Sequence, residues 1–435
     1  MIKTIKLFLK ILALWLFTLL IIPAELSAET GYLEVTAPGN RLLKLAVDAP
    51  RSLDSAPNTE SAREIGDLIA FDMNMSGNVT AEAGKQVTKP GLIAFAEPDF
   101  ASWMAAGYDL LVRSEFSIKG DVLTIEFRLH DVVNRKLISA KRYLGKTKDL
   151  RRFSHSFSDE ILLTLTGERG CFTTHIAFVS TQTGNKEIFI MDWDGHNLMQ
   201  LTRNGSINLN PDFSPDGSEI IFTSYKHGNP DLYKRALSNS IDVPVSRRQG
   251  LNITGAWSPD GSKIALSLSK DGNAEIYTIT KDGDNPKRLT VFSSIEVSPA
   301  WSPDAARLAF VSDRLGKPQI FVMDANGYNV RRLTTAGNYN VNPRWSPKGD
   351  RIAYARMQGG GFQIYTISAD GSGDIELTSV GSSENPAWSP DGRFIAFSSK
   401  RGGSEAIYVM RADGSGQIQV NRSQGNGTQP AWSSR

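Results

Sequence analysis

Histidine and cysteine are the side chains of this sequence that could most readily bind a metal or attack a substrate. We expect His175 and His196 on one face of the fold and His227 on the other, because they occupy turns at opposite ends of predicted strands. A zinc ion needs all its ligands within about 2–2.2 Å, so these side chains cannot share one. We interpret the histidines as surface or core residues; all five are His130, His155, His175, His196 and His227.

The other possible catalytic or ligand-binding motifs are incomplete. Cys171 is the single cysteine, so no internal disulfide can form, and no catalytic residues accompany it. Asp192-x-Asp194-Gly195 resembles the start of a calcium loop, but Arg203 stands where a bidentate glutamate is required. No Gly-x-Ser-x-Gly motif occurs, and the glycine pairs lie between predicted strands rather than before a helix. We therefore expect no catalytic residue, metal site or cofactor.

A repeated phrase defines the elements that hold these residues. Its aromatic residues are Phe213, Trp257, Trp301, Trp345, Trp388 and Trp432, at intervals of 44, 44, 44, 43 and 44 residues. The first five are followed by Ser-Pro-Asp-Gly or a close variant. A period of about 40–45 residues with strand-like content is typical of β-propeller blades. We interpret the aromatic rings as packing between blades.

Each repeat predicts four antiparallel strands. A Ser-Pro-Asp turn follows the inner strand, and Asp-Gly or Asn-Gly dipeptides close a later hairpin, as at Asp194-Gly195 and Asp282-Gly283. Gln429–Trp432 supplies an inner strand at the end of the chain, whereas His175–Phe178 begins as a second strand without one. Joining the two completes a sixth blade and leaves no unpaired rim strand.

The preceding sequence carries no repeat and predicts a mixed α/β fold. Residues 147–165 form an amphipathic helix, and glycines 167 and 170 then break it. The expected division is a signal peptide (1–28), an α/β domain (29–166), a linker (167–174) and a six-bladed propeller (175–435). The further elements expected are strands 32–36 and 42–48, helices 59–75 and 98–106, and a meander of strands 109–118, 122–131 and 137–144.

The amino terminus has the features of a secretory signal. Lys3, Lys6 and Lys10 precede an apolar stretch from Ile11 to Ile22, and small residues follow. We expect cleavage before residue 29, with an uncleaved anchor as the alternative. Removing residues 1–28 takes the formal charge from +2 to 0. A balanced charge argues against nucleic acid or an anionic membrane as the main partner.

The signal, the α/β domain and six repeats of the form W-S-P-D-G…I-A-F…I-Y-x-M…D-G…L-T together resemble the TolB family, periplasmic components of the Tol–Pal system. The resemblance covers nearly the whole mature chain. It implies a monomeric, non-catalytic protein that binds the lipoprotein Pal through the mouth of the propeller channel and TolA through its amino-terminal region. It also implies roles in outer-membrane integrity and cell division, with other outer-membrane lipoproteins and bacteriocins as further partners.

Applied to this sequence, the resemblance assigns two partner-binding sets. The channel mouth comprises short polar residues expected just before each inner strand, which could hydrogen-bond a partner loop entering the channel: Asn210, Asn252, Thr254, Glu296, Ser298, Asn342, Asn385 and Gln429. The TolA-facing segment comprises Glu29, Thr30, Gly31, Tyr32, Leu33, Glu34, Val35 and Thr36. The alternatives left open are a propeller enzyme acting on peptides or uronate-type sugars, and a propeller that binds an unknown envelope substrate.

Overall fold

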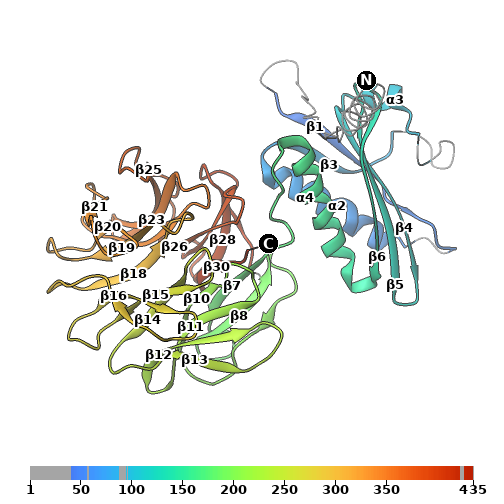
Figure 1. Cartoon of the computed structure of the whole chain (residues 1–435). Coiled ribbons are helices and arrows are strands. Elements are labelled where there is room, and N and C mark those ends of the chain that lie inside the picture. The colour runs from blue at the N-terminus through green and yellow to red at the C-terminus, as the bar shows by residue number, and fades with distance from the viewer. Residues whose placement is uncertain (1–40, 56–57, 88–94, 96, 422–425, 435) are drawn as a thin grey trace, which may run out of the picture. The chain divides into compact units, whose positions relative to one another are not determined.

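A mixed sheet with two long helices forms the amino-terminal region. The computed structural model describes residues 41–55, 58–87, 95, 97–421 and 426–434, all within one compact unit. The sheet order is β3-β1-β4-β5-β6, and β2 also pairs with β4 (Figure 1). Its strands are β1 (Leu43–Asp48), β2 (Arg51–Ser52), β3 (Val79–Lys85), β4 (Leu110–Lys119), β5 (Val122–Asp131) and β6 (Lys136–Lys146), and its helices are α2 (Thr59–Ser76), α3 (Phe100–Ala105), η1 (Thr147–Asp149) and α4 (Leu150–Thr166).

Local sequence signals explain where helix α2 begins and ends. The Asn58 side chain accepts a hydrogen bond from the Ser61 N–H at 3.0 Å, which caps the first turn. Gly77 ends the helix with φ 72°, a left-handed conformation that suits glycine. Strands β1 and β3 are parallel, and α2 is the crossover between them. The helices and the β4–β6 meander are confirmed as predicted. Strands β2 and β3 were missed, and expected strand 32–36 lies outside the described residues.

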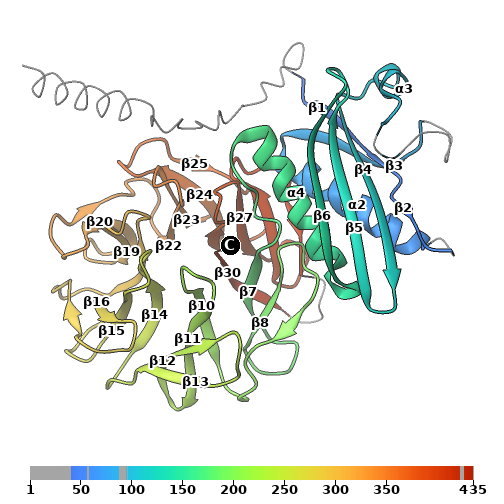
Figure 2. The same ribbon diagram turned by 45° about the vertical axis from the view of Figure 1, so that its right-hand side comes forward.

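Six four-stranded sheets form the propeller, in agreement with the repeat (Figure 2). Five of them are, in chain order, β10 (Asn208–Phe213), β11 (Glu219–His227), β12 (Asn229–Ala236) and β13 (Asp242–Ser246); β14 (Asn252–Trp257), β15 (Lys263–Leu268), β16 (Glu275–Thr280) and β17 (Lys287–Arg288); β18 (Glu296–Trp301), β19 (Arg307–Ser312), β20 (Gln319–Asp324) and β21 (Arg331–Arg332); β22 (Asn340–Trp345), β23 (Arg351–Gln358), β24 (Gly361–Ser368) and β25 (Ile375–Glu376); and β26 (Ser383–Trp388), β27 (Phe394–Ser399), β28 (Ala406–Arg411) and β29 (Ile418–Gln419).

The sixth sheet joins both ends of the repeated region. Its order is β30 (Gly427–Trp432), β7 (His175–Ser180), β8 (Glu187–Asp192) and β9 (Met199–Gln200). Strand β30 pairs antiparallel with β7, and the Trp432 indole donates a hydrogen bond to Thr174 Oγ1 at 2.7 Å. The predicted closure is therefore confirmed.

The repeated aromatic residues pack at the ends of the inner strands. Phe213, Trp257, Trp345 and Trp432 are buried, whereas Trp301 and Trp388 are half-buried. The Trp301 indole donates to the carbonyl of Ala256 at 3.2 Å, and that of Trp388 donates to the carbonyl of Arg344 at 3.1 Å. Each bond reaches the preceding blade, so the rings hold neighbouring blades together as predicted.

The fold also bears on membrane association. Within the described ranges, no helix combines the length and apolar character that a membrane crossing requires. The predicted signal peptide lies outside those ranges. The predicted limits of the two domains and their linker stay predictions.

Candidate protein-binding site on the propeller

A ring of six polar side chains lies inside the channel, on the third residue of each inner strand. All six have φ between 51° and 56°. Each sits where the pairing with the second strand shifts register, as between Leu209 and Asp212, so the positions are β-bulges. Asparagine tolerates positive φ better than most residues, which suits three of the six. The ring residues are Asn210, Thr254, Ser298, Asn342, Asn385 and Gln429.

The side chains of the ring leave little free space between them. The cavity it lines with Arg344 has a volume of about 20 Å³, close to what one water molecule occupies. Ring members also bond one another: Asn342 Nδ2 donates to Asn385 Oδ1, and the Asn210 N–H donates to Gln429 Oε1 at 2.9 Å. Little free space remains between these side chains in this conformation, and the expectation that a partner loop enters the channel between them stays a prediction.

Two residues predicted for the channel mouth, Asn252 and Glu296, lie elsewhere. Both are the first residues of inner strands and are fully buried. The Asn252 amide binds the preceding loop, accepting from the Arg248 N–H at 2.9 Å. Glu296 accepts from Arg314 Nη2 at 2.8 Å and from the hydroxyl of Ser312 at 2.7 Å. Asn252 is satisfied by the preceding blade and its loop, and Glu296 by its own blade, so both side chains hold loops in place and are buried from solvent.

An exposed apolar arc surrounds this end of the channel, and sequence reasoning missed it. The arc consists of Ile207, Leu251, Ile295 and Tyr339, each directly before an inner strand and between 36% and 53% exposed. The remaining two blades carry Ser382 and Asn426 at the same position. The arc therefore spans four consecutive blades. The sequence contains this pattern, because the four apolar residues follow one another at intervals of one repeat, 44 residues. Apolar groups gathered around a recess are typical of interaction sites.

The apolar surface extends beyond the arc. Val291 and Phe292 are exposed in the loop that precedes β18. Leu315 and Met357 are exposed at the β19–β20 and β23–β24 connections. In an antiparallel blade these connections lie at the same end as the start of the inner strand. The exposed apolar side chains at this end of the propeller thus form a group, whereas exposed apolar residues on a protein surface commonly occur singly.

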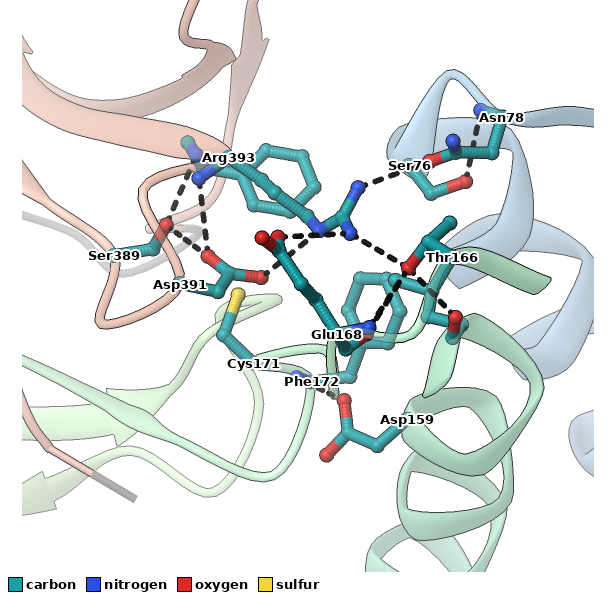
Figure 3. Close-up of polar contacts among 12 residues, drawn as sticks. Ser76, Asn78, Asp159, Thr166, Glu168, Cys171, Phe172, Ser389, Asp391 and Arg393 are labelled. Atoms are coloured by element: carbon teal, nitrogen blue, oxygen red, sulfur yellow. Dashed lines mark hydrogen bonds and ion pairs between the residues drawn. The ribbon is translucent and has the colours of Figure 1, made fainter. Parts of the chain in front are cut away.

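His130 and Cys171, two of the residues considered for chemistry, are buried in the fold. Among the described residues, no group of three or more His, Cys, Asp or Glu side chains could hold a metal ion. His130 is buried, and burial together with Arg113 and Arg128 lowers its pKa to about 4. Cys171 is fully buried beside Asp391, and burial raises the pKa of its thiol well above the ordinary value (Figure 3). A buried thiol held in its neutral form is a poor nucleophile.

His155 is the exception, because it is buried and charged. Its Nδ1 lies 2.8 Å from Asp72 Oδ2, and its Nε2 lies 3.5 Å from Asp194 Oδ2. Burial lowers its pKa, but the carboxylates of Asp72 and Asp194 outweigh burial and raise the pKa to about 10. Asp72 is on α2, His155 on α4 and Asp194 in the turn after β8. The cluster therefore fixes the two helices against a propeller turn.

A second polar contact joins the same two regions. Arg393, after the β26 turn, donates to Thr166 Oγ1 at 2.8 Å and to Asn78 Oδ1 at 3.3 Å (Figure 3). Glu168 Oε2 lies 3.4 Å from Arg393 Nη2 and 3.2 Å from Lys348 Nζ. The Asp159 carboxylate accepts from the Phe172 N–H at 2.8 Å, which orders the connection after α4.

The fold and this surface define a class: six-bladed β-propellers that follow an amino-terminal α/β region and expose an apolar arc around the channel. Residues 163–435 match the family model described as the TolB beta propeller domain, and residues 31–138 match the TolB amino-terminal domain. The chain belongs to the TolB family.

Similar proteins agree with this family. A relative from Geobacter sulfurreducens named Tol-Pal system protein TolB is 56% identical over 218 residues, and one of the same name from Geobacter metallireducens is 58% identical over 202 residues. These matches cover 50% and 46% of this chain and 50% and 47% of the two relatives, so the chain spans about half the length of the curated relatives it matches. A crystal structure of TolB from Acinetobacter baumannii superposes with a TM-score of 0.81 and 25% identity, covering 92% of this chain and 98% of the other.

Proposed function

We propose that this chain is a non-catalytic periplasmic interaction protein of the Tol–Pal system. It binds the lipoprotein Pal at the propeller end that carries the apolar arc, and TolA through residues 29–36, which lie outside the described residues. It acts as a monomer that supports outer-membrane integrity and cell division, and other outer-membrane lipoproteins and bacteriocins use the same surfaces. The proposed division of the chain is a signal peptide (1–28), an α/β domain (29–166), a linker (167–174) and the propeller (175–435).

The apolar arc is the observation that supports this proposal most directly. Stable protein interfaces bury about 800 Å² per partner and have an apolar centre with a polar rim. The arc offers apolar contacts on four blades, and the polar residues Ser382 and Asn426 continue the circle. The ring beneath it contributes polar groups at the bottom of the recess. The small free space within the ring supports docking of the partner onto this end of the propeller, with the ring at the bottom of the contact.

Charge placed on the arc tests the Pal assignment. We expect Tyr339→Asp and Ile295→Asp to weaken binding of the purified Pal periplasmic domain at least about tenfold, as expected when an unpaired charge enters an interface centre. Tyr328→Asp is the matched control, because Tyr328 is 71% exposed in the β20–β21 turn at the other end of the blade. Isothermal titration calorimetry gives the affinities. Equal affinity for the Tyr339 and Tyr328 variants would contradict the site.

The TolA assignment has a separate test. A mature chain lacking residues 29–36 should fail to capture the TolA periplasmic domain and should bind Pal with unchanged affinity. TolA capture by the truncated chain would show that another surface is responsible.

A further inference from the structure

The propeller channel has a second opening, at the end where the inner strands finish. A pocket of about 290 Å³ lies there. Tryptophans 301, 345, 388 and 432 and prolines 259, 303, 347 and 390 line it, the prolines coming from the repeated Ser-Pro turns. Among its lining residues, two are charged: Asp212 and Arg344. The apolar arc lies at the opposite ends of the same strands, and Arg344 lines both this pocket and the small cavity of the polar ring between the two ends.

The two charged residues occupy the same position in different blades. Each precedes the repeated aromatic residue directly, where the other four blades have alanine, at positions 256, 300, 387 and 431. Asp212 is on β10 and Arg344 is on β22, three blades apart in a ring of six. They therefore face one another across the channel. The small alanines between them leave the space that forms the pocket.

Arg344 has few partners inside the protein. Its guanidinium donates from Nη1 to the carbonyl of Pro343 at 3.3 Å, and it interacts electrostatically with the carboxylate of Asp212. A guanidinium has five N–H donors, so most of its donors remain for a ligand. The Asp212 carboxylate accepts from the Trp257 N–H at 3.0 Å and keeps a second oxygen for another donor.

The pocket thus combines an anion-binding group, an opposing acceptor and aromatic walls. A carboxylate pairs with a guanidinium through two parallel hydrogen bonds. A peptide amide or amino group next to that carboxylate could donate to Asp212. Side chains of the ligand would contact Trp301 and Trp388, which are half-buried and present ring surface. A volume near the lower end of the range for ligand pockets suits one or two amino-acid residues.

We propose that this pocket binds the free carboxyl terminus of a short peptide, with Arg344 holding the carboxylate and Asp212 accepting from the adjacent N–H group. A dianion such as phosphate fits less well, because Asp212 would repel it. Hydrogen bonds from a guanidinium to a carboxylate are charge-assisted and stronger than those between neutral groups. Arg344 should therefore contribute most of the selectivity for an acid over an amide.

The probe is the tripeptide Ala-Ala-Phe, used as the free acid and as its carboxamide on the full mature chain. We expect the acid to bind at least about tenfold more tightly than the amide, and Arg344→Gln to remove that preference. Arg307→Gln is the matched control, because Arg307 stacks on the Trp345 ring, 4.8 Å from its centre, without lining the pocket. Tryptophan fluorescence and calorimetry report binding.

The outcomes are distinguishable from those of the Pal experiment. An unchanged thermal transition in Arg344→Gln would show that the variant is folded, and a full acid preference in Tyr339→Asp would show that peptide binding does not depend on the Pal surface. Should Arg344→Gln unfold, Arg344→Lys, which keeps the charge but loses the paired geometry, replaces it and should show a reduced preference. Equal binding of acid and amide by the unaltered protein, or a full preference in Arg344→Gln, overturns the proposal.

Discussion

Replacement of His155 tests the charged cluster that fixes the helices to the propeller. His155→Gln removes the cation and leaves the Asp72 carboxylate, which is fully buried, without its counterion. Asp194 keeps Arg151 as a partner. Breaking one side of a buried ion pair costs about 3–5 kcal/mol, because the remaining charge is desolvated and unpaired. We expect the free energy of unfolding to fall by an amount in this range at pH 6.5.

The pH dependence of the folding stability tests the same cluster independently. The pKa of His155 is raised to about 10 in the folded chain, above the ordinary value of 6.5. A raised pKa means that the folded chain binds the proton more tightly than the unfolded chain does. The stabilisation is therefore complete below about pH 6.5 and is lost progressively as the pH rises towards 10. The stability difference between the unaltered chain and His155→Gln should shrink over the same interval.

Urea unfolding followed by tryptophan fluorescence between pH 6 and 10 measures both effects. His175→Gln is the matched control, because His175 is half-exposed and its Nε2 lies 3.5 Å from Asp192 Oδ1 at the surface. Surface ion pairs contribute about 0–1 kcal/mol. If His155→Gln and His175→Gln unfold at the same urea concentration, the cluster does not stabilise the fold as inferred. A stability of the unaltered chain that stays constant from pH 6.5 to 10 would contradict the charge assignment.

Three further predictions concern packing and closure. A Cβ on Gly283 would meet the Val245 carbonyl oxygen at 2.0 Å, so Gly283→Ala should lower the thermal transition temperature. Gly272→Ala is the control, because Gly272 also has positive φ but a Cβ there meets no atom within 4 Å. Equal transition temperatures of the two variants would refute the clash. Removing residues 428–435 takes the inner strand from β7 and should cause unfolding or aggregation in light scattering, whereas an unchanged melting transition would refute closure. Cys171 should react with a thiol reagent only on unfolding; rapid labelling of the native chain would show that it is accessible.

The sequence by itself determined the blade architecture of this protein. The 44-residue interval between aromatic residues, the Ser-Pro-Asp turns and the Asp-Gly hairpins are local signals, and each specifies the same strand order in every repeat. Unpaired strand sequences at the two ends required the closure between β30 and β7. Strand β3 escaped prediction because Thr80–Lys85 contains alanine, glutamate and glycine, which are weak strand formers. Its pairing with β1 is decided by the packing of helix α2.

Tertiary structure alone decided which of the predicted residues are accessible. Asn252 and Asn210 both lie near the start of an inner strand, yet Asn252, the first residue of β14, is buried under its loop, whereas Asn210, the third residue of β10, lies at the bulge in the channel ring. The charge on His155 depends on two carboxylates 83 and 39 residues away in the sequence. The opposition of Asp212 and Arg344 likewise depends on the ring bringing the first and fourth blades to facing sides. Burial and distance between remote residues set these properties, and neither can be read from local sequence.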